Sequence, residues 1–268
     1  MDQLHTDQAS SPPGGSHDHL YAFNTSELAW EFLRRNHDYQ NDFATLATPI
    51  PAPEPLTSGH RLWLAPNQPP TAPRWHLRPL VDPRLSALDA PLCWLPDTSA
   101  AILPATAVEA PVPSQADLSL TKPSCLQHIV VRHDGTQCLL VQSTDLSIAL
   151  HVRGDRILDT PVDLTFQLHR LFFAAKAGLW LSKLLGLLAA RQRRVWKTPR
   201  RKQLRDALIA FDGHLAGADY RDLALLIYGR AQVETEWSSA NRIMKDNVIR
   251  SLRRGRTLVQ GGYLRLIV

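Results

Sequence analysis

The stretch ADYRDLALLIYGRAQVETEWSSANRIMKDNVIRSLRRGR, from Ala218 to Arg256, predicts two helices with a break between them. Asp219 is a residue type that caps helix N-termini, and the apolar residues after it recur at helical spacing until Gly229, which favours a left-handed stop. After a polar break, the helical period resumes from Trp237 to Leu252, and Gly255 is placed to end it. Two consecutive helices of this kind are typical of a helix-turn-helix.

The second predicted helix separates an apolar face from a basic one. On a 100° wheel, Met244, Val248 and Leu252 share one side, and several cations share the other. A basic helix face is often only solvated, but it is also the face that a helix-turn-helix lays into the DNA major groove. The side chains that we expect to contact base edges are Arg242, Lys245, Ile249, Arg250 and Arg253.

A second group of cations lies on either side of this helix pair. Such side chains grip phosphates, which adds salt-dependent affinity but carries no base information, whereas a bidentate arginine on guanine discriminates between bases. The side chains that we expect to contact phosphates are Arg194, Lys197, Arg200, Arg201, Lys202, Arg254 and Arg256.

The chain of 268 residues is electrostatically divided. Residues 1–119 carry a net charge of −7 and residues 120–268 carry +12, so the overall +5 hides two opposite halves. A basic half suits a polyanion, and we interpret the acidic half as a partner-binding or regulatory module. The same charges leave a rival interpretation open, in which the basic helix docks on an acidic protein or on the acidic half of this chain.

Cysteine and histidine patterns favour neither a metal site nor an enzyme. Cys93, Cys125 and Cys138 are odd in number and widely spaced, which argues against a disulfide scaffold and a zinc site. His128 and His133 lie near Cys125, but they point to opposite faces of a predicted strand, and no oxyanion motif or phosphate loop accompanies them. We therefore expect no catalysis, no cofactor and no bound metal.

Neither export nor membrane insertion is expected. Met1 to His19 has no basic-then-apolar signal, so we expect a cytoplasmic protein. The most apolar stretch, Leu171 to Ala190, contains Lys176 and Lys183, which are costly at mid-membrane. We interpret this stretch as a buried helix.

The predicted fold class is α+β, and its first half is rich in proline. Residues 1–18 are expected to be a disordered tail, followed by a domain at 19–97 that is led by one helix. That helix starts with a capping box, Asn24 with Glu27, and runs toward Leu46. Beyond it, 15 of the 20 prolines lie between residues 49 and 113, but three tryptophans there indicate order up to about residue 97. Residues 98–119 are expected to be a Pro/Ala linker.

The second half, residues 120–268, is predicted to begin with a small antiparallel sheet. Gln127–Val131 and Gln137–Gln142 alternate like a β-hairpin, which Ile148–Val152 and Leu164–Phe166 extend. A helical part follows and includes the variant helix-turn-helix at about 218–256. The paired glycines at 261 and 262 predict a C-terminal hairpin, either a wing beside the basic helix or a strand completing the sheet.

Two parts of the chain resemble a known family. Asp219–Gly229 (DYRDLALLIYG), Arg250–Arg256 (RSLRRGR) and Leu258–Leu266 (LVQGGYLRL) resemble the RovC-like DNA-binding domain of type VI secretion transcription factors. Leu28–Asp42 (LAWEFLRRNHDYQND) and Trp75–Pro96 (WHLRPLVDPRLSALDAPLCWLP) resemble the transcriptional-regulator-like domain that precedes it in FseA-like activators. The likeness covers most of residues 20–97 and 125–268.

The resemblance implies a proteobacterial activator of type VI secretion genes or of genes of integrative and conjugative elements. It would bind double-stranded promoter DNA in a sequence-specific way, with RNA polymerase or an antiactivator protein as further candidate partners. We expect a homo-oligomer, because two half-sites multiply affinity. Single-domain relatives act as antiactivators, so the alternative is a protein-binding module that sequesters a regulator without binding DNA.

Overall fold

The computed structural model describes residues 17–67, 72–95, 102–120, 126–142, 147–166, 178–185, 198–237 and 242–267. The chain forms two compact units. We call Met1–Tyr21 with Thr198–Arg254 the helical unit, and Ala22–Lys197 with Gly255–Val268 the sheet unit. The predicted tail at 1–18 lies outside the described residues except for its last two positions.

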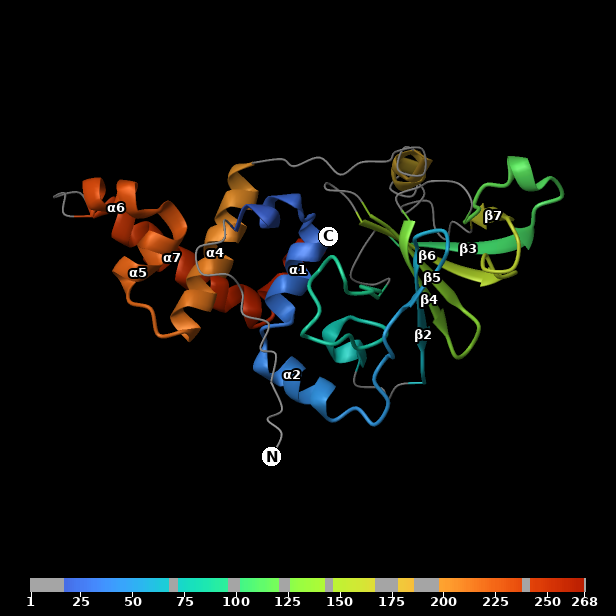
Figure 1. Cartoon of the computed structure of the whole chain (residues 1–268), viewed down its shortest axis with the longest axis horizontal. Coiled ribbons are helices and arrows are strands. Elements are labelled where there is room, and N and C mark those ends of the chain that lie inside the picture. The colour runs from blue at the N-terminus through green and yellow to red at the C-terminus, as the bar shows by residue number, and fades with distance from the viewer. Residues whose placement is uncertain are drawn as a thin grey trace, which may run out of the picture. The chain divides into compact units, whose positions relative to one another are not determined.

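The helices are α1 Thr25–Leu33, α2 His37–Ala44, α4 Pro199–Leu215, α5 Tyr220–Tyr228, α6 Arg230–Glu236 and α7 Ile243–Val259, with residues 178–185 also helical (Figure 1). The strands are β1 Glu54–Pro55, β2 Arg61–Ala65, β3 Ile102–Glu109, β4 Leu126–Arg132, β5 Gln137–Gln142, β6 Ser147–Gly154 and β7 Val162–Phe166. The 3-10 helices are η1 His17–Ala22, η2 Ala72–Trp75, η3 Pro113–Gln115 and η4 Gly262–Leu266.

The strands form one mixed sheet of seven strands in the order β1-β2-β4-β5-β6-β3-β7. The predicted hairpin is confirmed: β4 and β5 are antiparallel with Ile129 opposite Leu139, and Gly135 takes a positive φ of 78° in the turn. The sheet is larger than the small antiparallel one that the sequence predicts, because β2 pairs with β4, and β3 with β6, in parallel. Such pairs join segments far apart in the chain, which local periodicity does not reveal.

The described part of the predicted linker, residues 102–119, contributes β3 between β6 and β7, so this part is not a linker. Leu103, Ala105 and Ala107 alternate along β3 and point into the core. Small side chains are sufficient at these positions because strands pair with both edges of β3. Pro104 is opposite His151 of β6, whereas pairing with β7 begins one residue later. The missing N–H of this proline therefore interrupts no bond to β7.

The helical residues 178–185 pack on the sheet with one face only. Leu184 is buried against the core that contains Ile129 and Leu150, but Leu179 and Leu185 are 54% and 70% exposed. The prediction of a buried helix is thus wrong for the part of that stretch that the structure describes. None of the described helices is long and apolar enough to cross a membrane.

The predicted leading helix is in fact two helices. Its capping box is confirmed: Glu27 N donates to Asn24 Oδ1 at 2.9 Å, and Asn24 N donates to Glu27 Oε2 at 2.9 Å. The single helix is wrong because Asn36 starts a new one, its side chain accepting from Tyr39 N at 3.0 Å. A side-chain oxygen that satisfies a free N–H competes with continued helix at this position.

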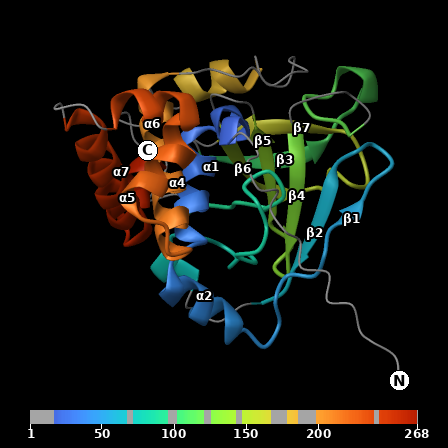
Figure 2. The same ribbon diagram turned by 60° about the vertical axis from the view of Figure 1, so that its left-hand side comes forward.

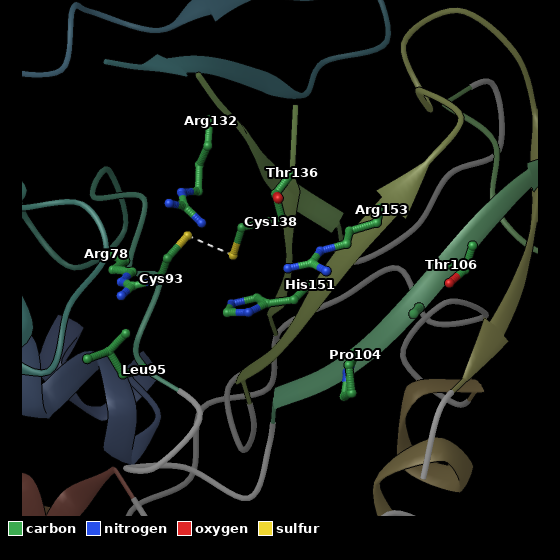
Figure 3. Close-up of a pocket in the computed structure, with 11 residues that line it drawn as sticks. Arg78, Cys93, Leu95, Pro104, Thr106, Arg132, Thr136, Cys138, His151 and Arg153 are labelled. Atoms are coloured by element: carbon green, nitrogen blue, oxygen red, sulfur yellow. Dashed lines mark hydrogen bonds between the residues drawn. The ribbon is translucent and has the colours of Figure 1, made fainter. Parts of the chain in front are cut away.

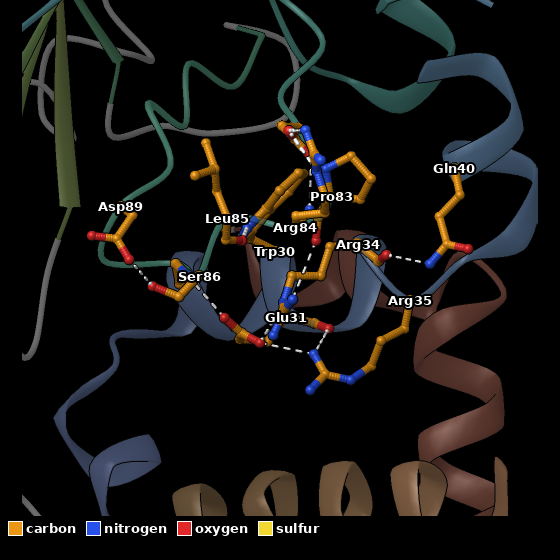
Figure 4. A network of polar contacts seen from close by, with 12 residues as sticks. Trp30, Glu31, Arg34, Arg35, Gln40, Pro83, Arg84, Leu85, Ser86 and Asp89 are labelled. Carbon is orange, nitrogen blue, oxygen red and sulfur yellow. Dashed lines mark hydrogen bonds and ion pairs between the residues drawn. The ribbon is translucent and has the colours of Figure 1, made fainter. Parts of the chain in front are cut away.

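A buried carboxylate joins α1 to the proline-rich segment (Figure 4). Glu31 is 2% exposed, and its oxygens accept from Arg34 Nε at 2.7 Å, Arg35 Nη1 at 2.8 Å and Ala87 N at 2.9 Å. Burial raises the pKa of Glu31, but the two guanidinium groups outweigh burial and hold that pKa below its ordinary value. Trp30 Nε1 also donates to Leu85 O at 3.0 Å, so the proline-rich segment is ordered as its tryptophans indicate.

The C-terminus is helical, so the predicted hairpin is wrong. Helix α7 continues through Gly255 to Val259, and Gly261, with a φ of 111°, then turns the chain into η4. Within the sheet unit, η4 packs against α1, and Tyr263 Oη donates to Trp75 O at 3.4 Å. The paired glycines end a helix here instead of joining two strands.

Helices α4, α5, α6 and α7 lie together (Figure 2), and the helical unit has its own apolar core. Asp219 caps α5 as predicted, accepting from the N–H groups of Arg221 and Asp222, and Gly229 ends it with a φ of 83°. The predicted polar break contains a further helix, α6, of which Val233 is the buried residue. One buried side chain in seven residues leaves too weak a period for this helix to be predicted.

Candidate nucleic-acid interface

Helix α7 turns one face into the helical unit and leaves the other exposed. Met244, Val248 and Leu252 are at most 5% exposed and pack with buried residues of α4 and α5, such as Ile209 and Leu223. This arrangement confirms the predicted apolar face of the basic helix. The opposite face must therefore meet solvent or a partner.

The predicted base-contacting side chains lie on the outer half of α7, except for Arg242, which immediately precedes the helix. Arg242, Lys245, Arg250 and Arg253 are exposed, and Ile249 is half-buried. Lys245, Ile249 and Arg253 follow one another at four-residue spacing, so they form one line along the helix. Among the described residues, Arg242, Lys245 and Arg250 form no ion pair, so their charge is not neutralised within the protein.

Arg250 lies on a different edge of α7 from that line. It borders a groove of about 280 Å³ within the helical unit, which α4, the end of α5 and the middle of α7 enclose. The groove is lined by Pro199, Lys202, Gln203, Asp206, Tyr228, Asn247, Arg250, Ser251 and Arg254. Three cations and one carboxylate line it, so its net charge is positive.

Internal contacts hold the walls of this groove. Lys202 Nζ lies 3.0 Å from Asp206 Oδ2 and 5.3 Å from the centre of the Tyr228 ring, and Arg254 Nη1 donates to Gln203 Oε1 at 2.7 Å. Burial lowers the pKa of the Lys202 ammonium, but Asp206 outweighs burial and holds that pKa above its ordinary value. Lys202 therefore stays charged at neutral pH while part of its charge is compensated.

The side chains predicted to grip phosphates have different environments. Arg200, Lys202, Arg254 and Arg256 are exposed, although Arg256 belongs to the sheet unit. Arg201 does not fit the prediction, because it is 8% exposed and its Nη1 donates to Tyr21 O at 3.0 Å inside the helical unit. Arg194 and Lys197 lie outside the described residues.

The groove contains residues that were not among the predicted contacts, and three of them come from α5 and α7. Tyr228 closes α5, and Asn247 and Ser251 of α7 lie one turn apart beside Arg250. The four-residue spacing of Asn247 and Ser251 is visible in the sequence, but only the packing of α7 on α4 places them in a positive groove.

The two histidines near Cys125 differ in burial. His128 is 1% exposed, and its Nδ1 accepts from Trp63 Nε1 at 3.0 Å, whereas His133 is exposed. These positions fit a core residue and a surface residue. Cys125 lies outside the described residues.

Comparison with known protein families agrees with this geometry. Residues 174–267 match the family described as "T6SS, Transcription factor, DNA binding domain", and residues 14–78 match the proteobacterial transcriptional regulator-like domain. No curated protein matches the chain. Neither matching family is enzymatic. The chain is thus a transcriptional regulator in which a match to the proteobacterial regulator-like domain precedes a match to the type VI secretion transcription factor DNA-binding domain.

Proposed function

We propose that this regulator is an activator that binds promoter DNA of type VI secretion genes or of integrative and conjugative elements. Helix α7 enters the major groove as the second main helix of a variant helix-turn-helix, and α5 and α6 support it. The cytoplasm, where promoters are accessible, is its place of action. A homo-oligomer on two half-sites and contact with RNA polymerase or an antiactivator complete the proposal.

The observation that carries the proposal is the division of α7 into a fully packed face and an exposed basic face. Its 17 residues extend about 26 Å at 1.5 Å per residue, enough to lie along a major groove. Lys245 and Arg253 lie on the outer line with Ile249, which can meet a thymine methyl group. Folding alone gives no reason to gather exposed cations on this face.

The positive groove suits a phosphate next to the contacted bases. Lys202 and Arg254 line it, and Arg200 is exposed one residue after the first position of α4. Phosphate contacts from one side fix the register in which α7 meets the bases. Arg250 lies between the groove and the outer line, where it can reach a base edge.

Arg250→Ala and Arg200→Ala test the division of roles. Fluorescence anisotropy with the full-length protein measures affinity for the upstream duplex and for a scrambled duplex of equal length. Arg250→Ala should reduce discrimination between the duplexes by about 1–3 kcal/mol, roughly fivefold to a hundredfold or more. Arg200→Ala should weaken binding to both duplexes equally.

Arg230→Ala is the matched control, because Arg230 is an exposed cation of the same unit whose side chain pairs with Glu234 at 3.6 Å, on α6 and not on α7. Equal losses on both duplexes for Arg250→Ala would remove its base-reading role. Absence of DNA binding at low salt by the wild type, together with inhibition of a second regulator's activity, would instead establish the antiactivator alternative. A promoter-reporter assay decides between activation and repression.

A further inference from the structure

Two cysteines far apart in the sequence meet inside the sheet unit. Cys93 Sγ donates a hydrogen bond to Cys138 Sγ at 2.7 Å, and the two residues are 2% and 3% exposed. Both are free thiols. Cys138 lies on β5 opposite His151 of β6, while the Cys93 carbonyl accepts from Arg78 N at 2.8 Å. Backbone hydrogen bonding in two different segments therefore positions the two cysteines.

The two sulfurs line a cavity of about 430 Å³ that is rich in cations (Figure 3). Arg78, Arg132, Arg153 and His151 line it together with the side chains of Thr106 and Thr136. Arg132 also pairs with Asp134 at 3.3 Å, and no carboxylate side chain lines the cavity. His151 Nε2 is buried and has no hydrogen-bond partner among the described residues. The cavity thus gives a small polar molecule access to buried sulfur.

The environment makes the two thiols chemically different. Burial raises the pKa of the Cys93 thiol well above its ordinary value. Burial acts in the same direction on Cys138, but the hydrogen bond from Cys93 and the nearby His151 and Arg132 outweigh it and lower the pKa of Cys138 to about 6. Cys138 is therefore the thiolate and Cys93 the thiol of the pair. A thiolate beside a second cysteine is the arrangement of redox-responsive proteins.

We propose that Cys138 and Cys93 form a reversible oxidation site that takes a small hydroperoxide in this cavity. The Cys138 thiolate attacks one peroxide oxygen, the O–O bond breaks, and the leaving hydroxide takes a proton to become water. The resulting sulfenic acid then reacts with Cys93, so that an S–S bond forms and a second water leaves. In sum, two thiols and hydrogen peroxide give one disulfide and two waters.

The groups around the sulfurs fit each step. The guanidinium groups of Arg132 and Arg153 and the His151 ring turn into the cavity (Figure 3), where positive charge stabilises a developing hydroxide. Closing the disulfide requires the Sγ–Sγ distance to fall from 2.7 Å to about 2.0 Å. A dithiol reductant returns the disulfide to two thiols by thiol–disulfide exchange and is itself oxidised, as expected of a disulfide in a reducing compartment. All the residues of this site belong to the sheet unit.

The test treats the reduced full-length protein with hydrogen peroxide, unfolds it in urea, blocks the remaining thiols with N-ethylmaleimide and measures the intact mass. We expect the wild type to lose two of its three alkylation sites, a peptide map to show Cys93 joined to Cys138, and dithiothreitol to restore both thiols. The matched control Cys125→Ser should form the same disulfide. Cys93→Ser should leave a sulfenic acid on Cys138 that dimedone traps.

The pH dependence distinguishes a reactive pair from two cysteines that merely pack in a core. At pH 6 the oxidation rate should be about half of its plateau value at high pH. For an ordinary thiol with a pKa of about 8.5, the rate at pH 6 would be roughly 300-fold below its plateau. Three alkylatable thiols after peroxide treatment, a disulfide that includes Cys125, or unchanged oxidation of Cys138→Ser would each overturn the proposal. Far-UV circular dichroism verifies that the serine variants are folded.

Discussion

Neighbouring arginines at the start of α4 should respond to substitution in opposite ways. Arg200 is exposed, whereas Arg201 is 8% exposed and donates from Nη1 to Tyr21 O at 3.0 Å. The sequence predicts a phosphate contact for both. The exposure of Arg200 is compatible with a phosphate contact, whereas the side chain of Arg201 connects α4 to η1.

The expected magnitudes follow from these contacts. A hydrogen bond from a charged group contributes about 1.5–3 kcal/mol, so Arg201→Ala should lower the free energy of unfolding by at least that amount. Arg200→Ala should change it by less than about 0.5 kcal/mol. In DNA binding the order reverses: Arg200→Ala should reduce the slope of log affinity against log salt by about 0.9, and Arg201→Ala should leave it unchanged.

Two measurements check this prediction on the full-length protein. Urea titration followed by circular dichroism gives the change in stability. Anisotropy titrations at several salt concentrations, under conditions where both variants are folded, give the slope. An Arg201→Ala variant that is as stable as the wild type and has a reduced salt slope would refute the assignment. Equal behaviour of the two variants would show that the burial of Arg201 has no consequence.

Two further substitutions test the sheet unit. Glu31→Gln should lower the free energy of unfolding by about 3–5 kcal/mol at pH 7, because it leaves Arg34 and Arg35 without a buried counter-charge. The pKa of Glu31 is lowered on folding, so its contribution to stability is fully present above the ordinary value of 4.5 and is lost as the pH falls from there through the lowered pKa of the folded protein. In urea titrations the difference in stability between variant and wild type should therefore be smaller at pH 4 than at pH 7. Gly154 has a φ of +95°, and Gly154→Ala would also place the new Cβ against Ala107 O. The substitution should therefore lower the free energy of unfolding by more than the roughly 1–2 kcal/mol that the backbone strain alone accounts for. Gly59→Ala is the control, because Gly59 has a φ of +83° with open space around it, so that only the backbone strain lowers stability. Equal losses of stability in the two variants would contradict the contact with Ala107.

Some features of the fold follow from local chemistry. Asn24 and Asp219 are caps because their side-chain oxygens reach N–H groups two or three residues away. The packed face of α7 follows from the helical spacing of Met244, Val248 and Leu252. Each signal lies within a few turns, so the sequence is enough to predict it.

Other features depend on partners that are distant in the chain. The sequence determined, through capping residues, helical period and charge, that a basic helix follows a shorter one near the C-terminus. The tertiary structure alone decided that residues 102–109 form a strand between β6 and β7, that Arg201 is buried while Arg200 is exposed, and that Cys93 meets Cys138. The physical reason is that burial and pairing are set by the packing surface that other segments provide, and a local pattern contains no information about that surface.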